Sequence, residues 1–430
     1  MANDPNDTSS PIDRTFDAGW VQSLVSKFGK ANNGGVAIYE LDNEPEWWDH
    51  TQADVHPLPN TYDELTNDGL TYAQTIKDND PTAEVSGPVL SCWICYFYSK
   101  LDMETGWATS PCYCANGNPV DRLAHGDVPL VEYYLQHFAA YEALHGIRLL
   151  DYLDLHFYNP DNLAFSLGGD TSVQQLRLNS TRILWDPTYT NLNFTDPNNR
   201  TSSAPPVSSQ LIPLARSWVA KDYPGTKVAI TEYNWGGTDS ISGALAQADL
   251  LGIFGSYGLD MATLWWNTYD AQTAVQQQLP LLMAFGVYRN YDGQNSMFGD
   301  VALTSTSANQ GMLSVYGALR SSDNAVTVVV INKTYGDLTS TISIPNLKPT
   351  GPAKVFLYSN ANLGAIVAQP DLAVAPSVSL RAASTLTETF PAQSITVLAV
   401  SNALSPGRRE PFRAELNRYR FAGRKADTLR

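Results

Sequence analysis

The feature that most constrains the fold is a change of pattern near Tyr291-Asp292-Gly293. Before this turn sequence, short apolar and β-branched runs alternate with amphipathic stretches, whereas after it only short β-branched runs remain, separated by Gly, Pro, Asn and Asp. Alternating strands and helices predict a parallel sheet or barrel, and a series of short strands predicts a β-sandwich. The sequence therefore predicts an α/β domain followed by an all-β domain.

Individual elements can be placed by the same criteria. In the first region we expect strands at 36–41, 83–86, 152–157, 227–231 and 261–265, and helices at 63–77, 129–144 and 211–220. Residues 159–209 are rich in Asn, Ser, Thr and Pro, which favours a long loop on the active face of a barrel. In the second region we expect strands at 325–331, 340–344, 354–358 and 394–400.

Composition and charge narrow the classes of partner. A length of 430 residues suits about two domains with a large core. The net charge of −16 argues against nucleic acid and anionic membrane surfaces, because polyanion binding depends on clustered Lys and Arg. A neutral polysaccharide meets no such repulsion. No apolar stretch approaches the roughly eighteen residues of a membrane span, and residues 1–10 show no signal peptide.

The four cysteines lie in one segment that is rich in Tyr and Trp. Cys92 and Cys95 form a C-x2-C pair, and Cys112 and Cys114 form a C-x-C pair. Four thiolates could hold a zinc ion, but the second pair is tighter than the usual zinc pattern. Two disulfides that pin a surface loop are the more ordinary interpretation for an extracellular chain.

Two short motifs carry candidate catalytic residues. Leu41-Asp42-Asn43-Glu44-Pro45 and Ile230-Thr231-Glu232-Tyr233-Asn234-Trp235 each place a glutamate directly after an apolar run. Glycosidic bonds are cleaved by two carboxyl groups, one that protonates the leaving oxygen and one that attacks the sugar or activates water. Either glutamate alone could simply be solvated or ion-paired at a strand end. Both together favour Glu44 and Glu232 as a catalytic pair.

These motifs and several others resemble glycoside hydrolase family 44. The resemblance includes 39–48, 54–57, 148–158 with its His156-Phe157-Tyr158, 231–236, 246–255, 260–265 and 330–333, and so covers roughly residues 17–402. Members of this family are retaining endo-β-1,4-glucanases, many with xyloglucanase activity, built from a (β/α)8 TIM-type barrel and a β-sandwich. The resemblance implies hydrolysis of cellulose-type glucan, carboxymethylcellulose or xyloglucan. A β-mannanase or xylanase of the same clan is the alternative, because the two glutamates indicate the reaction and not the sugar.

Carried over residue by residue, the resemblance makes Glu44 the general acid/base and Glu232 the nucleophile. In a retaining enzyme the two carboxyl groups lie about 5–5.5 Å apart, here at the carboxyl ends of the strands. His156 and Tyr158 alternate on one strand and should face the same side, either toward substrate or as hydrogen-bonded core residues. The expected substrate-binding residues are Asn43 at the sugar 2-hydroxyl, Trp265 as a platform, Trp48 and Trp235 at flanking subsites, and His156 and Tyr158.

The resemblance also sets expectations for organisation and partners. Only 43 residues precede Glu44, whereas three βα units of about thirty residues each should do so. We therefore expect residues 1–293 to form a barrel that lacks its first three strands, with 294–402 as the sandwich and 403–430 as a basic, disordered tail. A truncated, inactive glycan-binding remnant is a further alternative. We expect an extracellular monomer that acts on β-glucan, without nucleic acid or membrane partners and without a required cofactor; a structural calcium ion occurs in the family.

Overall fold

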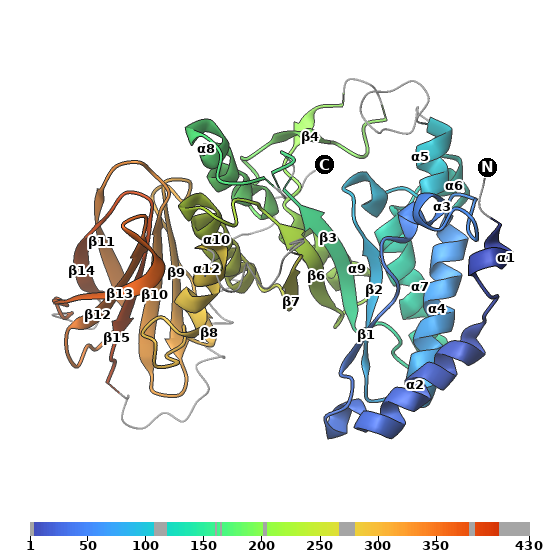
Figure 1. Cartoon of the computed structure of the whole chain (residues 1–430), viewed down its shortest axis with the longest axis horizontal. Helices are drawn as coiled ribbons and strands as arrows, with labels where there is room; N and C mark the ends of the chain where they lie inside the picture. The colour runs from blue at the N-terminus through green and yellow to red at the C-terminus, as the bar shows by residue number, and fades with distance from the viewer. Residues whose placement is uncertain are drawn as a thin grey trace. The chain divides into compact units, whose positions relative to one another are not determined.

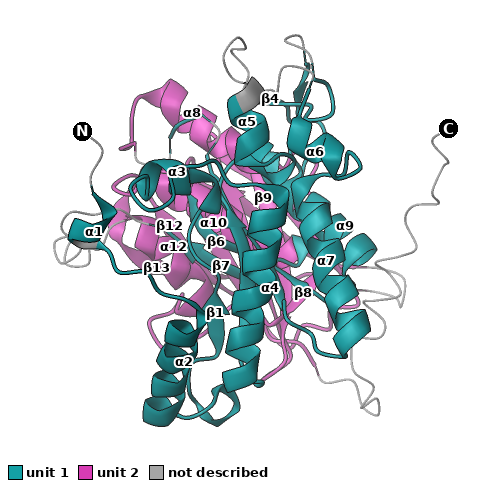
Figure 2. Ribbon diagram, turned by 90° about the vertical axis from the view of Figure 1, so that its right-hand side faces the viewer, with its two compact units in different colours: residues 1–164, 182–234, 257–267 teal, residues 165–181, 235–256, 268–430 magenta. Residues whose placement is uncertain are grey.

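The computed structural model describes residues 4–106, 118–159, 161–163, 166–200, 204–265, 280–377 and 383–403. The chain divides into two compact units (Figure 2). Unit 1 contains residues 1–164, 182–234 and 257–267, and unit 2 contains 165–181, 235–256 and 268–430. This division differs from a boundary at 293, because helices α8 (Thr171–Ser180), α12 (Pro280–Arg289) and nearly all of α10 (Ile241–Tyr257) group with the C-terminal strands. The predicted tail lies almost entirely outside the described residues.

Unit 1 is built on a five-stranded parallel sheet (Figure 1). Its strand order is β1-β2-β3-β6-β7, so β1 and β7 form its edges. The strands are β1 (Ile38–Glu40), β2 (Glu84–Leu90), β3 (Tyr152–Tyr158), β6 (Lys227–Asn234) and β7 (Met261–Leu264). All four neighbouring pairs are parallel. This confirms the five strands that the sequence predicts, in the predicted chain order.

Four longer helices connect and cover these strands: α2 (Arg14–Phe28), α4 (Tyr62–Asn79), α7 (Leu130–His145) and α9 (Leu211–Asp222). Helix α4 begins where the Thr61 hydroxyl accepts a hydrogen bond from the Glu64 N–H, and its buried face includes Leu65 and Ile76. The short helices of unit 1 are α1 (Pro5–Thr8), η1 (Ala31–Asn33), η2 (Pro45–Trp47), α3 (Trp48–Thr51), η3 (Ile94–Tyr96), α5 (Lys100–Gly106) and α6 (Val120–Ala124). None of the described helices is long and apolar enough to cross a bilayer.

The prediction that residues 159–209 form one long loop is wrong. This stretch contains α8, the 3-10 helix η5 (Thr181–Leu184), and the strands β4 (Asn191–Thr195) and β5 (Pro206–Val207). Asp170 starts α8 by accepting hydrogen bonds from the N–H groups of Ser172 and Val173. Helix α8 is polar, so its composition resembles that of a loop. The capping residue Asp170 was the signal in the sequence that could have indicated a helix.

Unit 2 contains the predicted sandwich. A six-stranded antiparallel sheet has the order β13-β12-β15-β10-β9-β8, and β11 pairs with β14. The strands are β8 (Val301–Leu303), β9 (Leu313–Arg320), β10 (Ala325–Asn332), β11 (Leu338–Pro345), β12 (Ala353–Ser359), β13 (Asn362–Leu372), β14 (Ala383–Phe390) and β15 (Ser394–Val400). Buried Val328 and Leu398 of the larger sheet share one apolar cluster with Leu386 and Phe390 of β14. Alternating inward residues thus build the core between the two sheets.

A buried ion pair joins helix α10 to this sandwich. Lys333 Nζ lies 2.6 Å from Asp249 Oδ2, and both side chains are 1% exposed. The Tyr316 hydroxyl and the Thr181 hydroxyl each donate to Asp249 at 2.7 Å. Because a Cβ at Gly252 would lie 2.3 Å from the Tyr316 ring, only glycine permits this approach. These contacts join residues of the motifs at 246–255 and 330–333.

Candidate active site

The loop after β1 is tied to the end of β2. The Leu41 N–H donates to the Ser86 carbonyl at 2.9 Å, and the Glu44 N–H donates to the Val89 carbonyl at 3.2 Å. Both Glu44 (φ 46°) and Val89 (φ 64°) have left-handed backbone, which is costly for a β-branched residue. Pro45 then opens η2 with its fixed φ. Strained backbone that the surroundings enforce is typical of functional sites.

Strands β3 and β6 bring the second carboxylate to the same place. Asp154, His156 and Tyr158 alternate on β3 and therefore share one face. His156 pairs in register with Glu232, after a shift that leaves Thr231 as an extra residue in β6. A similar shift occurs at Val89 in β2. Such bulges re-aim side chains next to functional sites.

The imidazole of His156 lies between the two predicted catalytic glutamates. Its Nδ1 is 2.9 Å from Glu44 Oε1 and 3.4 Å from Glu232 Oε2. This nitrogen and one oxygen of each carboxylate all lie within 4.8 Å of one another. The Tyr158 hydroxyl donates to Glu232 Oε2 at 2.5 Å, and the Tyr96 hydroxyl donates to the His156 carbonyl at 2.5 Å. Glu44 and Glu232 are therefore close together and share partners.

The site holds several acidic groups around this one imidazole. Burial alone would lower the pKa of His156, but its hydrogen bond with Glu44 and the negative charges of Glu232, Glu44 and Asp154 raise the pKa above its usual value. Asp154 is fully buried and accepts hydrogen bonds from Ser86 and Thr231, yet burial raises its pKa. Glu40 is an exposed residue, but the protein atoms around its carboxyl and the charge of Asp154 raise its pKa to about 7.

Two of the three groups of described side chains that could hold a metal ion fit one poorly. Among the described residues, one such group is Glu44 with His156 and Glu232, and another contains Glu46 with the two bonded sulfurs of Cys92 and Cys95. The third is Asp49, His50 and Glu104. The Lys100 ammonium lies 3.8 Å from Asp49 and 3.9 Å from Glu104 and would repel a cation there. A structural calcium ion therefore stays a prediction.

Three predicted substrate contacts occupy accessible positions near the strand ends. Asn43 is exposed and directly precedes Glu44. Trp48 is half-buried and makes an edge contact with His56, with ring centroids 5.4 Å apart. Trp265 follows β7 and is 48% exposed. Their contacts with substrate stay predictions.

Two other predicted contacts need correction. Trp235 is 2% exposed, and its indole N–H donates to the Ser180 hydroxyl at 3.1 Å, so the ring is a core residue and offers no open platform. His156 is also fully buried and contacts the carboxylates, so it is placed to orient them rather than to meet a sugar. Trp47 donates to Ser91 and packs under Lys100, while Trp266 lies outside the described residues.

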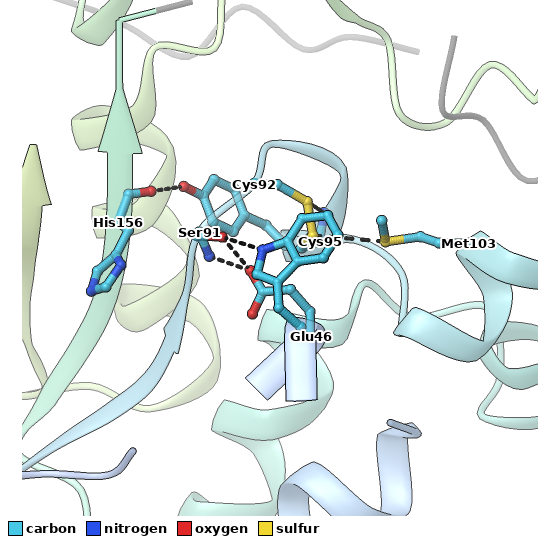
Figure 3. The surroundings of a disulfide bond; sticks show 8 residues. Glu46, Ser91, Cys92, Cys95, Met103 and His156 are labelled. Carbon is cyan, nitrogen blue, oxygen red and sulfur yellow. Dashed lines mark hydrogen bonds between the residues drawn. A yellow bond between two sulfur atoms is a disulfide. The ribbon is translucent and has the colours of Figure 1, made fainter. Parts of the chain in front are cut away.

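The cysteine segment follows β2 directly. Cys92 and Cys95 form a disulfide, which leaves neither as a thiolate zinc ligand (Figure 3). Buried Glu46 accepts hydrogen bonds from the backbone N–H and the hydroxyl of the adjacent Ser91. Burial raises the pKa of Glu46 to about 7. Cys112 and Cys114 lie outside the described residues.

Sequence reasoning missed Asp154, Glu40 and Glu46 as parts of this site. For Asp154 a signal existed, because it stands two positions before His156 on the same strand. Glu40 ends β1 and carried no comparable pattern. Glu46 is buried by the turn of η2, which local sequence did not reveal.

Comparison with known proteins bears on the family and the fold of this chain. The model of glycoside hydrolase family 44 matches residues 1–161. The crystal structure of CelM2, a bifunctional glucanase-xylanase from a metagenome library, is 37% identical, with a TM-score of 0.81 over 94% of this chain and 72% of that chain. A family 44 endoglucanase from Clostridium acetobutylium ATCC 824 is 30% identical, with a TM-score of 0.70 over 89% of this chain and 70% of that chain. The chain belongs to glycoside hydrolase family 44.

Proteins similar to this chain differ from it in length. Endoglucanase A of Paenibacillus lautus is 33% identical over 324 residues, which are 74% of this chain and 42% of that protein. The chain therefore spans about two fifths of the length of this curated relative. A xyloglucanase of Paenibacillus polymyxa, solved with xyloglucan, is 27% identical with a TM-score of 0.73, and 92% of this chain and 74% of that chain are covered. The likeness to family 44 structures includes both the parallel sheet and the C-terminal sandwich.

Proposed function

We propose that this protein is a retaining, endo-acting hydrolase of β-1,4-glucans, with Glu232 as nucleophile and Glu44 as general acid/base. The observation that carries the proposal is the approach of the two carboxylates, of which one oxygen each lies within 4.8 Å of the other. Retaining glycosidases hold their carboxyl groups about 5–5.5 Å apart, whereas inverting enzymes separate them by about 6.5–9.5 Å to admit a water. The endoglucanase and xyloglucanase names of relatives support cellulose-type glucan, carboxymethylcellulose and xyloglucan as substrates.

In this mechanism Glu232 attacks the anomeric carbon and forms a glycosyl ester, while Glu44 protonates the departing oxygen. Glu44 then removes a proton from the water that cleaves the ester. The Tyr158 hydroxyl and the His156 imidazole both contact Glu232 Oε2, and so orient its carboxylate. The nucleophile is thus held in place before the substrate arrives.

The two roles can be separated by substrate. Glu232→Ala should abolish turnover on every substrate, because no ester can form. Glu44→Ala should abolish turnover of carboxymethylcellulose but spare an activated aryl cellobioside, whose leaving group needs little protonation. Azide should restore turnover of Glu44→Ala and give the β-glycosyl azide by NMR.

Glu388→Gln serves as the control, since it removes a carboxyl on the sandwich strand β14. It should keep activity within a few-fold of the parent protein. Equal losses of Glu44→Ala on both substrates would remove its assignment as proton donor. An α-anomer as the first product of the parent protein would show inversion and overturn the proposal.

A further inference from the structure

A hollow in unit 1 has a lining suited to an uncharged ligand. It encloses about 410 Å³, within the range of roughly 300–1,000 Å³ that is typical of small-ligand sites. Trp93, Phe97 and Leu214 contribute apolar walls, and Asn198, Ser208 and Gln210 contribute amide and hydroxyl groups. None of the described lining residues is charged. We call this site the Trp93 hollow.

The Trp93 hollow lies at the same end of the sheet as the catalytic glutamates. Trp93 and Phe97 follow the carboxyl end of β2, and Asn198 and Ser208 belong to the connection that follows β3. In a parallel sheet of a barrel these connections all emerge at the carboxyl ends of the strands. The Tyr96 hydroxyl, from the same 3-10 turn as the hollow's aromatic wall, donates to the His156 carbonyl. A polymer that runs across this end of the sheet can therefore contact both the catalytic glutamates and the Trp93 hollow.

The aromatic wall is held rigidly. The Trp93 indole N–H donates to the Thr195 carbonyl at 2.9 Å, and the ring makes edge contacts with Phe97 and Phe194 at centroid distances of 5.0 and 5.5 Å. The residue nonetheless remains half-buried rather than buried. A fixed, partly accessible indole can stack on the apolar face of a sugar without losing conformational freedom.

The polar groups suit sugar hydroxyls. The Ser208 hydroxyl donates to the Asp186 carbonyl at 2.7 Å, which leaves its oxygen lone pairs as acceptors. Gln210 precedes α9 with left-handed backbone (φ 42°) and makes no capping bond with its side chain, whose amide supplies both donors and an acceptor. The Gln210 amide can serve a sugar hydroxyl in either role and the Ser208 hydroxyl can accept, and none of the described lining residues is charged.

We propose that the Trp93 hollow binds a sugar unit of the same neutral β-glucan chain, away from the bond that is cleaved. This rests on the proposed function for the identity of the polymer. We expect binding there to hold long chains and to leave unaffected any substrate that is too short to reach the hollow.

The test compares polymer binding with turnover of a short substrate. Trp93→Ala should lower the apparent affinity for xyloglucan, measured by retardation in native gels that contain this polymer, by about tenfold. This is the size of one aromatic stacking contact. Trp93→Phe should lose less. Both variants should turn over an aryl cellobioside at the parent rate.

Leu214→Glu provides a variant that keeps the fold. It removes an apolar wall and adds a charge in the first turn of α9, where a carboxylate favours the helix dipole. It should lose polymer affinity as Trp93→Ala does. Leu144→Glu is the matched control, since Leu144 is 78% exposed near the end of α7.

The outcomes separate this proposal from the function. If the parent protein hydrolyses glucans, but Trp93→Ala and Leu214→Glu bind xyloglucan as tightly as it does, the hollow is not a glycan site. If the variants lose polymer binding and aryl cellobioside turnover equally, the residues have a structural role and the proposal for the hollow is overturned. The proposal is also overturned if xyloglucan gels do not retard the parent protein. Trp93-dependent binding without any hydrolysis would support the hollow and refute the function.

Discussion

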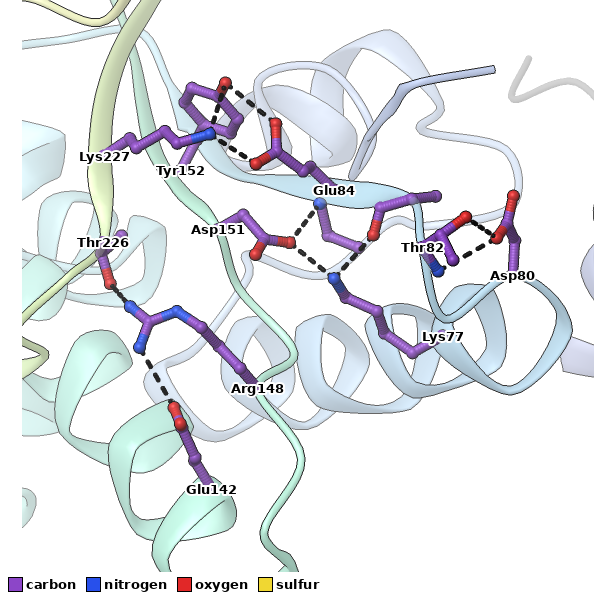
Figure 4. A network of polar contacts seen from close by, with 12 residues as sticks. Lys77, Asp80, Thr82, Glu84, Glu142, Arg148, Asp151, Tyr152, Thr226 and Lys227 are labelled. Carbon is purple, nitrogen blue, oxygen red and sulfur yellow. Dashed lines mark hydrogen bonds and ion pairs between the residues drawn. The ribbon is translucent and has the colours of Figure 1, made fainter. Parts of the chain in front are cut away.

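The two ends of the parallel sheet in unit 1 differ in how their carboxylates are balanced. At the amino end each of three carboxylates faces a cation: Asp151 with Lys77, Glu84 with Lys227, and Glu142 with Arg148 (Figure 4). At the carboxyl end, four acidic residues surround the single imidazole of His156: Glu40, Glu44, Asp154 and Glu232. In barrels of this kind the amino end stabilises the fold and the carboxyl end carries the chemistry.

This difference shows where the chain gives up stability for reactivity. Each carboxylate at the amino end has a cation beside it, whereas burial and neighbouring negative charges at the carboxyl end raise the pKa of Glu40 and Glu46 to about 7. The left-handed Glu44 and Val89 lie at the same end. Perturbed acids and strained backbone that coincide are typical of an active site. Variants at the two ends should therefore change different properties.

The largest effect is expected at the nucleophile. Glu232→Ala should lower kcat/KM on carboxymethylcellulose by about 10⁴-fold or more, since the covalent route is lost. The free energy of unfolding should change by only about 1 kcal/mol, because the residue is one of several acids that repel each other. Activity on the polymer and urea unfolding check the two expectations. A loss of less than tenfold would contradict the role of Glu232.

The next effect concerns the buried carboxyl of Glu46. Its pKa is raised from 4.5 to about 7, so the folded protein keeps a proton that the unfolded chain releases. Stability should therefore fall as pH rises from about 4.5 to about 7 and then level off. Glu46→Gln removes this dependence and should gain up to about 3 kcal/mol relative to the parent between pH 4 and pH 8.

Urea unfolding at several pH values measures this difference. Glu388→Gln, on the sandwich strand β14, is the control that alters a carboxyl in the other unit. The same pH dependence in the parent and in Glu46→Gln would show that the pKa of Glu46 does not differ between the folded and the unfolded state.

The sequence predicted those features that repeat along the chain. The five strands and the alternation of His156 with Tyr158 depend on local periodicity, and Glu44 and Glu232 stand in short motifs that follow apolar runs. The prediction that Trp235 contacts substrate was wrong, because in the sequence a tryptophan after a strand looks the same whether its ring packs inward or faces solvent. Glu46 is buried because it meets Ser91 of a distant chain segment, and local sequence does not contain that information.

A smaller catalytic effect is expected for His156, which orients both carboxylates. His156→Asn should lower kcat by about 10²-fold, the usual cost of misplacing a reacting group by an ångström. Its raised pKa means that the imidazolium stabilises the fold below the unfolded value and that this contribution disappears as pH rises through the folded pKa. The variant should therefore lose more stability at pH 6 than at pH 9. A pH-independent loss would mean that the imidazole packs without charge.

The smallest effect is expected at the amino end. Lys77 Nζ lies 2.7 Å from Asp151 Oδ2 and also donates to the Ala83 carbonyl, with the lysine side chain 10% exposed. Lys77→Met should cost about 2 kcal/mol of unfolding free energy, because it leaves a largely buried carboxylate without its cation. Lys354→Met, which breaks an exposed pair with Asp371, should cost less than about 1 kcal/mol. Both variants should keep kcat/KM on carboxymethylcellulose within about twofold of the parent, because neither lies at the carboxyl end of the sheet. A tenfold loss of activity in Lys77→Met, with stability unchanged, would show that the two ends are not functionally separate.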